Sequence, residues 1–219
     1  MLLEYTGTPY EDYLYAGGAF MVSVFLAAAE YEKSQWTKDR TVLGLDFPNL
    51  PYLIDGPIKI TQSNAILRHI ARKHRLCGEI EEEMVRVDML ENQVMDFRMS
   101  LVRVCHDPDF EKLKPEYLEQ LPGQLKLFSQ FLGQRKWFAG KNLTYADFLV
   151  YDILEVNCMF EPKCLDQFQN LKDFLVHVES LPRIAAFLNS DRVISTPVFM
   201  KMAKWGNKET LAEARNLED

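Results

Sequence analysis

The chain has 219 residues, of which 47% are hydrophobic and 26% are charged, values typical of a globular protein. This composition excludes a disordered, collagen-like or low-complexity chain, and the length suffices for a core that needs no disulfide or metal. The formal net charge of −7 argues against nucleic acid as a partner, because that affinity comes mainly from Lys and Arg side chains on phosphates.

The first unusual feature is an uncharged run between Asp12 and Glu30. Apolar runs near the start also occur in signal peptides, but these need a positively charged beginning, and no Lys or Arg precedes Lys33. The run Ala16–Ala29 is also short for a membrane span, which needs roughly 20 residues. We therefore expect a buried helix, or a segment foreign to the fold, in a cytoplasmic chain with no membrane partner.

Two short apolar runs predict a β-hairpin. Leu50–Ile54 and Ile58–Thr61 flank Asp55-Gly56-Pro57, which has the residues of a tight turn. A helix is predicted to follow over Ser63–Lys73, and Gly78 is expected to stop it. The first part of the chain therefore reads as an α/β unit.

From Glu81 onward the apolar residues recur with a helical period. One stripe comprises Val87, Leu90, Val94, Phe97, Leu101 and Val104, and a second comprises Leu118, Leu121, Leu125, Phe128 and Leu132. Gly133 is expected to end the second helix. Pro122 is expected to kink or break it, because proline has no backbone N–H to donate.

Shorter helices are predicted after these two. Thr144 followed by Asp147 resembles a capping box and predicts a helix start. Two further helices fit Leu171–Glu179 and Pro182–Ser190. We therefore expect an α/β domain at residues 1–78, an all-helical domain at 81–208 and a polar tail at 209–219.

The four cysteines are Cys77, Cys105, Cys158 and Cys164, and no two of them have CxxC spacing. We expect free, mostly buried thiols that act as small apolar core residues in a reducing compartment. Cys105-His106-Asp107 has the residue types of a catalytic triad, but adjacent residues on a helix do not face each other, so we reject that reading. We predict no metal site.

Several sequence strings resemble the mu class of glutathione transferases. They are LGLDFPNLPYLIDG from Leu43, KITQSNAIL from Lys59, EKLKP, WFAG, DFLVYD, FEPKCLD and WGNK, and the resemblance is nearly continuous from Ser34 to Lys208. It implies a thioredoxin-like domain, an all-helical domain and a cytoplasmic homodimer. It also implies an enzyme that conjugates glutathione, its co-substrate, to hydrophobic electrophiles in detoxification, with no other cofactor.

The resemblance places part of a glutathione site around the hairpin. Gln62 and Ser63 lie where a strand meets a helix start, and there free N–H groups and a hydroxyl can hold the γ-glutamyl carboxylate. Leu50-Pro51 resembles the family's cis-proline turn, which would present the Leu50 backbone to the cysteinyl part as an added strand rung. Asn49 is adjacent. Taken alone, Gln62-Ser63 would be an ordinary helix cap.

Further positions match the family's contacts to the charged ends of glutathione. Trp36 resembles its indole donor to the glycyl carboxylate, and Arg40 falls where the family usually has Lys. Lys33 falls where the family usually has Arg, so it keeps the charge but loses the bidentate fork, and carboxylate binding is expected to weaken. Asp96 resembles the carboxylate that reaches the glutamyl amine from the partner subunit. Taken alone, Trp36 would be an ordinary aromatic residue and Asp96 a residue on a solvated helix face.

Two positions concern the electrophile and the partner subunit. His106 falls where the family often has a tyrosine lying over the electrophile, and a neutral imidazole can also donate a hydrogen bond. Phe47, beside Pro48, would ordinarily be a core residue, but the family uses this position as a key inserted into the partner subunit.

The chain also departs from the family's pattern at its start. The family begins with a strand whose tyrosine hydroxyl bonds the glutathione sulfur and favours the thiolate. Here Met1–Thr6 matches the middle of the family's first helix, so we expect the first strand of the thioredoxin-like domain to be missing. No catalytic residue is therefore identified, because Tyr5 and Tyr10 match non-catalytic positions.

A second departure is an apparent insertion at about residues 16–30, which has no family counterpart. One hypothesis is that Phe20–Leu26, rich in β-branched and aromatic residues, takes the place of the missing strand. An alternative function follows from both departures. It is that of a catalytically inactive relative, acting as a dimer partner of related subunits or as a ligand-binding protein.

Overall fold

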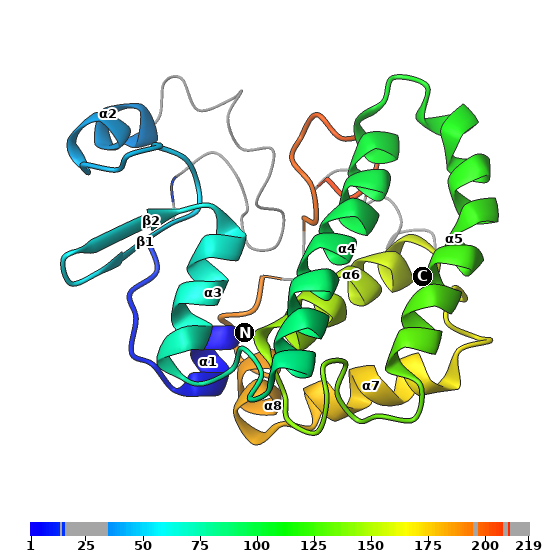
Figure 1. Ribbon diagram of the computed structural model, residues 1–219. Helices are drawn as coiled ribbons and strands as arrows, with labels where there is room; N and C mark the ends of the chain where they lie inside the picture. Colours follow the sequence, from blue (N-terminus) through cyan, green and yellow to red (C-terminus); the bar gives the residue numbers. More distant parts are fainter. Residues whose placement is uncertain (14, 16–34, 195–196, 208–209, 211–219) are drawn as a thin grey trace. The chain divides into compact units, whose positions relative to one another are not determined.

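The computed structural model describes residues 1–13, 15, 35–194, 197–207 and 210 (Figure 1). Two compact units are distinguished: Met1–Thr8 with Ala71–Val193, called here the helical unit, and Pro9–Ile70 with Ile194–Asp219, called the hairpin unit. The domain limits expected from the sequence stay a prediction. None of the helices among the described residues is long and apolar enough to cross a membrane.

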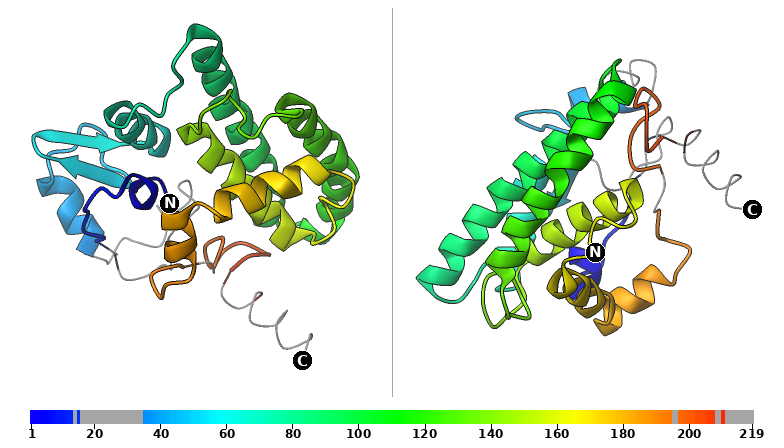
Figure 2. Two further views of the ribbon diagram at one scale, coloured as in Figure 1. Left: turned by 90° about the horizontal axis from the view of Figure 1, so that it is seen from below. Right: turned by 90° about the vertical axis from the view of Figure 1, so that its right-hand side faces the viewer.

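The helical unit is built from packed helices. They are α1 (Leu2–Thr6), α4 (Glu81–His106), α5 (Phe110–Leu132), α6 (Tyr145–Phe160), α7 (Gln169–Glu179) and α8 (Pro182–Leu188). Helices α4 and α5 run side by side (Figure 2), and both α4 and α7 pack against α6. Both predicted apolar stripes lie on buried faces, with Leu101 and Leu125 fully buried. The stripes therefore form the core of this unit.

The break expected at Pro122 does not occur. Helix α5 is continuous through both Pro115 and Pro122. Proline removes one backbone hydrogen bond, but Leu121 and Leu125 on either side of Pro122 are buried. Packing of this apolar face holds the helix together across the missing bond.

The start of α6 is fixed by the capping box that Thr144 and Asp147 predict. Asp147 is fully buried, and its carboxylate accepts the backbone N–H groups of Phe138 and Thr144, each at 2.8 Å. Burial raises the pKa of Asp147 to about 6, although these hydrogen bonds lower it in part. The carboxylate thus links the helix start to the preceding loop.

The first residues of the chain pack on the helical unit. The Arg192 guanidinium donates to both carboxylate oxygens of Glu4, at 2.6 and 2.9 Å. The ring of Tyr5 lies 5.5 Å from that of Phe148, centroid to centroid. These contacts explain why Met1–Thr8 belongs to this unit although it lies far away in the sequence.

The hairpin unit contains α2 (Gln35–Val42), β1 (Tyr52–Asp55), β2 (Ile58–Thr61) and most of α3 (Ser63–Lys73). The predicted hairpin is confirmed, and its two strands pair antiparallel through a turn in which Gly56 has a φ of 60°. The predicted bounds of α3 are also confirmed. No sequence pattern predicted α2, in which Trp36 is the buried residue.

Some sequence predictions fall outside the described residues. They concern the insertion at residues 16–30, the hypothesis for Phe20–Leu26, the position of Lys33 and most of the tail at 209–219. None of the four cysteines forms a disulfide, as the sequence predicts. The predicted burial is complete only for Cys105, since the other three residues are half-buried.

Candidate functional site

The strand register places two segments that were predicted to bind glutathione at the same end of the hairpin. Tyr52 on β1 lies opposite Thr61 on β2. Leu50-Pro51 immediately precedes Tyr52, and Gln62-Ser63 immediately follows Thr61. Because the strands are antiparallel, both segments lie at the open end of the hairpin, opposite its turn. We call this region the open hairpin end.

On the first strand side, Asn49 is exposed and Leu50 is buried. The Leu50 backbone N–H donates to the Asn49 side-chain oxygen at 2.9 Å. The Leu50-Pro51 peptide bond is cis, as the resemblance implied. A ligand that pairs with the Leu50 N–H must therefore displace the Asn49 side-chain oxygen from it.

On the second strand side, Gln62 is exposed and has a φ of 71°. A positive φ is uncommon for a residue other than glycine, and such backbone is frequent at functional sites. Helix α3 starts at Ser63, and the Gln62 carbonyl accepts the Ile66 N–H at 3.0 Å. The first N–H groups of a helix have no acceptor within the helix, and they favour a negatively charged ligand. The geometry here can therefore hold a carboxylate.

An aromatic cluster supports the same end of the hairpin. The ring of Trp36 stacks on that of Tyr52, with 5.9 Å between centroids and 13° between planes. Trp36 is also buried together with Tyr15, Leu45 and Leu50. Trp36 and Leu50, two predicted glutathione contacts, therefore share one cluster.

Tyr15 is a component of this cluster that the site prediction missed. Its hydroxyl lies 3.1 Å from the Tyr52 hydroxyl, and its ring meets Trp36 edge-on at 5.4 Å. Burial, together with the hydrogen bond to Tyr52, raises the pKa of Tyr15 well above its ordinary value. The hydroxyl stays protonated at neutral pH and serves to position its neighbours. No sequence pattern marks it, because Trp36 and Tyr52 are distant from it along the chain.

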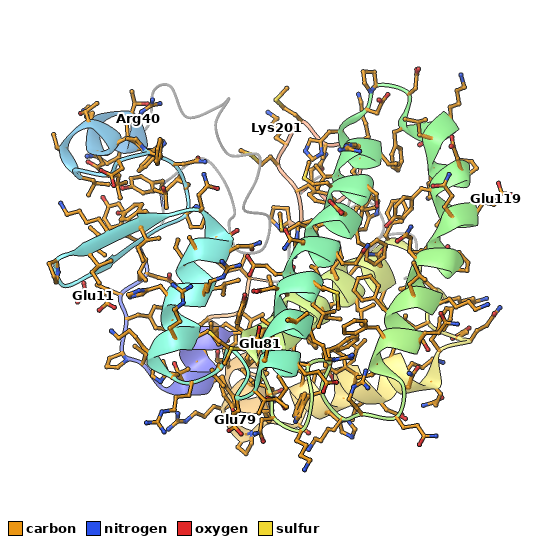
Figure 3. All side chains as sticks on the ribbon, in the orientation of Figure 1. Glu11, Arg40, Glu79, Glu81, Glu119 and Lys201 are labelled. Carbon is orange, nitrogen blue, oxygen red and sulfur yellow. The ribbon has the colours of Figure 1, made fainter. Side chains whose placement is uncertain are left out.

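The remaining predicted site residues take different positions. Arg40 is exposed on α2 (Figure 3). Asp96 is exposed on α4. His106, at the end of α4, is half-buried, and its Nδ1 lies 2.9 Å from the Val102 carbonyl oxygen. Asp96 and His106 belong to the helical unit, and Arg40 belongs to the hairpin unit.

Phe47 is 76% exposed, so its ordinary reading as a core residue is wrong. It precedes Pro48 in a loop where both residues face solvent. A large exposed aromatic side chain is the kind of residue that fills a pocket on a partner. As for metals, the described part of the chain has no group of three or more His, Cys, Asp or Glu that could hold one.

Two family models match the chain. The model of the glutathione S-transferase N-terminal domain matches residues 1–72, and that of the glutathione S-transferase C-terminal domain matches residues 94–182. Together they cover both the open hairpin end and most of the helical unit. The fold is therefore the thioredoxin-like domain of a glutathione S-transferase followed by its all-helical domain.

Comparison with curated relatives identifies the class of glutathione S-transferase to which the chain belongs. Over 208 residues, the chain is 60% identical to glutathione S-transferase Mu 1 of Bos taurus and 61% identical to glutathione S-transferase Mu 4 of Mus musculus. Each alignment covers 95% of this chain and 92% of the relative. The chain belongs to the mu class of glutathione S-transferases, and by close homology it is a glutathione transferase.

Solved structures agree with this fold. The glutathione S-transferase Blo t 8 is 27% identical, with a TM-score of 0.79 over 94% of this chain and 92% of that one. A pi-class glutathione S-transferase of Onchocerca volvulus is 33% identical, with a TM-score of 0.64 over 70% of this chain and 75% of that one. The resemblance stated from the sequence is thus confirmed at the level of family and fold.

Proposed function

We propose that this chain binds reduced glutathione at the open hairpin end and conjugates it to hydrophobic electrophiles through the glutathione thiolate. The observation that carries the proposal is the pairing of Tyr52 with Thr61, which sets Leu50 and Ser63 at the same end of one hairpin. Leu50 offers the backbone edge of a strand, and Ser63 offers the start of a helix. Glutathione needs both, since it is an extended peptide with carboxylates at its two ends.

In this proposal each segment binds a different part of the ligand. The first N–H groups of α3 and the Ser63 hydroxyl hold the γ-glutamyl carboxylate. The Leu50 backbone pairs with the cysteinyl residue once the Asn49 side chain moves away. The Trp36 indole and the Arg40 guanidinium bind the glycyl carboxylate. Lys33, which lies outside the described residues, is assigned to the same carboxylate by the family resemblance alone.

The proposal includes a homodimer in the cytoplasm, as the family resemblance implies. Phe47 supports it, because a side chain 76% exposed would lose water contact on entering a partner's pocket. Burying a Phe side chain contributes about 1.5–3 kcal/mol. In the dimer, Asp96 of each subunit reaches the glutamyl amine bound by the other, and His106 lies over the electrophile. Replacing Phe47 with Ser should raise the monomer fraction in size-exclusion chromatography with light scattering, and an unchanged dimer would count against this role.

The catalytically inactive relative is the second candidate function. It is favoured by the aromatic cluster, in which the Tyr15 and Tyr52 hydroxyls bond each other and Tyr15 is buried. The resemblance gives none of the described tyrosines the role of activating the thiol. A chain of this kind would still bind glutathione or apolar ligands and form dimers with related subunits.

Two measurements separate these candidates. Conjugation of glutathione to chlorodinitrobenzene, followed by absorbance, should exceed the rate without protein if the chain is an active transferase. Background turnover by a chain that still binds glutathione in isothermal titration would favour the inactive relative.

A variant tests the site itself. Ser63→Ala removes a hydrogen bond to a carboxylate, which contributes about 1.5–3 kcal/mol, so glutathione should bind about ten- to a hundredfold more weakly. The matched control is Ser180→Ala, an exposed serine at the end of α7 whose hydroxyl donates to His177. Equal affinity of both variants and the wild type would contradict the proposed site.

A further inference from the structure

Two thiols of the helical unit lie side by side. Cys158 belongs to the last turns of α6, and Cys164 to the turn that follows this helix. Their sulfur atoms are 3.8 Å apart, within hydrogen-bond distance for sulfur. Both residues are half-buried, which leaves part of each open to a small reagent. From the sequence these cysteines are expected to be small apolar core residues, and their spacing matches no familiar redox motif.

The backbone holds the two sulfurs close together. The Glu161 N–H donates to the Asn157 carbonyl at 2.8 Å at the end of α6, and the Cys164 N–H donates to the Glu161 carbonyl at 2.9 Å. These bonds fold the turn back on the helix end. A disulfide has an S–S distance of about 2.05 Å, so the sulfurs need to approach by under about 2 Å, which side-chain rotation and a small shift of the turn can supply.

The surroundings give the two thiols different acidities. The hydrogen bond between the two thiols lowers the pKa of Cys158, and the positive charge of Lys172 acts in the same direction. The same hydrogen bond raises the pKa of Cys164, and burial and the Glu161 carboxylate raise it further. These pKa directions favour Cys158 as the more acidic thiol of the pair, and the thiolate is the nucleophilic form of cysteine.

We propose that Cys158 and Cys164 form a redox pair that small-molecule disulfides, such as oxidised glutathione, convert reversibly to an intramolecular disulfide. First, the Cys158 thiolate attacks one sulfur of the reagent, which forms a mixed disulfide and expels one glutathione thiolate. Cys164 then loses its proton to water and attacks the Cys158 sulfur, which expels the second glutathione thiolate. One disulfide is reduced to two glutathione molecules and two protein thiols are oxidised, so electrons and protons balance.

The other two cysteines provide internal comparisons. Cys105 is fully buried, and burial raises its pKa to about 12, so it should stay reduced. Cys77 is half-buried like the pair, so the extent of its reaction shows how readily a partly accessible thiol of this chain reacts. A selective reaction at Cys158 and Cys164 would thus reflect their geometry rather than exposure alone. The proposal does not depend on the glutathione site at the hairpin.

The test uses the purified, folded full-length chain. It is incubated with oxidised glutathione, its remaining thiols are alkylated, and tryptic peptides are analysed by mass spectrometry. Lys163 separates the two cysteines, so the expected product is a pair of tryptic peptides joined by a Cys158–Cys164 bond, which dithiothreitol releases. The expected protein mass is lower by two hydrogen atoms, with no glutathione retained.

Variants trap the intermediate and provide a control. Cys164→Ser should retain one glutathione on Cys158, because the resolving thiol is gone, whereas Cys77→Ser should form the internal disulfide as the wild type does. Circular dichroism verifies that each variant is folded. Any of three results with the wild-type chain would overturn the proposal. They are that both thiols stay reduced, that a stable mixed disulfide accumulates at Cys158, or that either cysteine is linked to Cys77 instead.

Discussion

The buried carboxylate of Asp147 offers a sharp test of how the helical unit is held together. Asp147→Ala removes the acceptor of three hydrogen bonds. Two come from the backbone N–H groups of Phe138 and Thr144, each at 2.8 Å, and one from the Thr144 hydroxyl at 3.1 Å. The hydroxyl can rotate to another acceptor, but the backbone N–H groups are fixed.

The expected loss follows from these two fixed donors. A buried donor left without an acceptor costs about 1–3 kcal/mol. Two such donors give an expected loss of about 2–6 kcal/mol in the free energy of unfolding. That is a large part of the 5–15 kcal/mol, roughly, that stabilises a typical protein.

Urea unfolding followed by far-UV circular dichroism measures this loss. Asp147→Asn keeps one acceptor oxygen in place and should lose less than Asp147→Ala. The control is Asp173→Ala, because Asp173 is exposed on α7 and accepts from Gln169 four residues earlier. Its expected change is within about 0.5 kcal/mol. An Asp147→Ala chain within about 1 kcal/mol of the wild type would refute the capping argument.

Three further predictions concern the same unit. Arg98→Met leaves the half-buried Asp152 carboxylate without the guanidinium that binds it, so urea unfolding should show a loss of about 1–3 kcal/mol. Adding Asp152→Leu should recover most of this loss, and no recovery would contradict the ion-pair argument. Pro122→Ala supplies a missing N–H inside α5 and should raise the urea midpoint, whereas a lower midpoint would show that this proline favours the helix. The raised pKa of Asp147, about 6 against 3.8, means that the folded chain binds this proton more tightly. The stability that this tighter proton binding contributes is therefore full below about pH 4 and declines as the pH rises through about 6. Over this range the free energy of unfolding of the wild type should fall relative to that of Asp147→Asn. A difference between the two that does not change with pH would contradict the prediction.

Local sequence signals predicted the elements that depend on local physics. The bounds of α3 follow from a serine start and basic last turn, and the hairpin from turn residues between two apolar runs. Helix α2 was missed because Trp36 is its one buried residue, so the sequence shows no apolar period. Of the kink or break predicted at Pro122, the break does not occur, because the burial that outweighs the lost hydrogen bond comes from tertiary packing.

The candidate site was predictable in its segments but not in its geometry. The family resemblance pointed to Leu50 and Ser63, and the strand register then set them at one end of the hairpin. Periodicity could not reveal that Tyr15 joins Trp36 and Tyr52, because contacts between distant segments leave no local pattern. The exposure of Phe47 likewise depends on the loop around it rather than on its apolar side chain.

The most direct test of the proposed function is isothermal titration of reduced glutathione into the purified, folded chain, beside the Ser63→Ala variant. Saturable binding with a micromolar to millimolar dissociation constant, weakened about tenfold or more in the variant, is the expected result. It would mean that the open hairpin end holds the γ-glutamyl carboxylate. A folded chain that releases no heat of binding, or binds equally well without the Ser63 hydroxyl, would contradict the site proposed here.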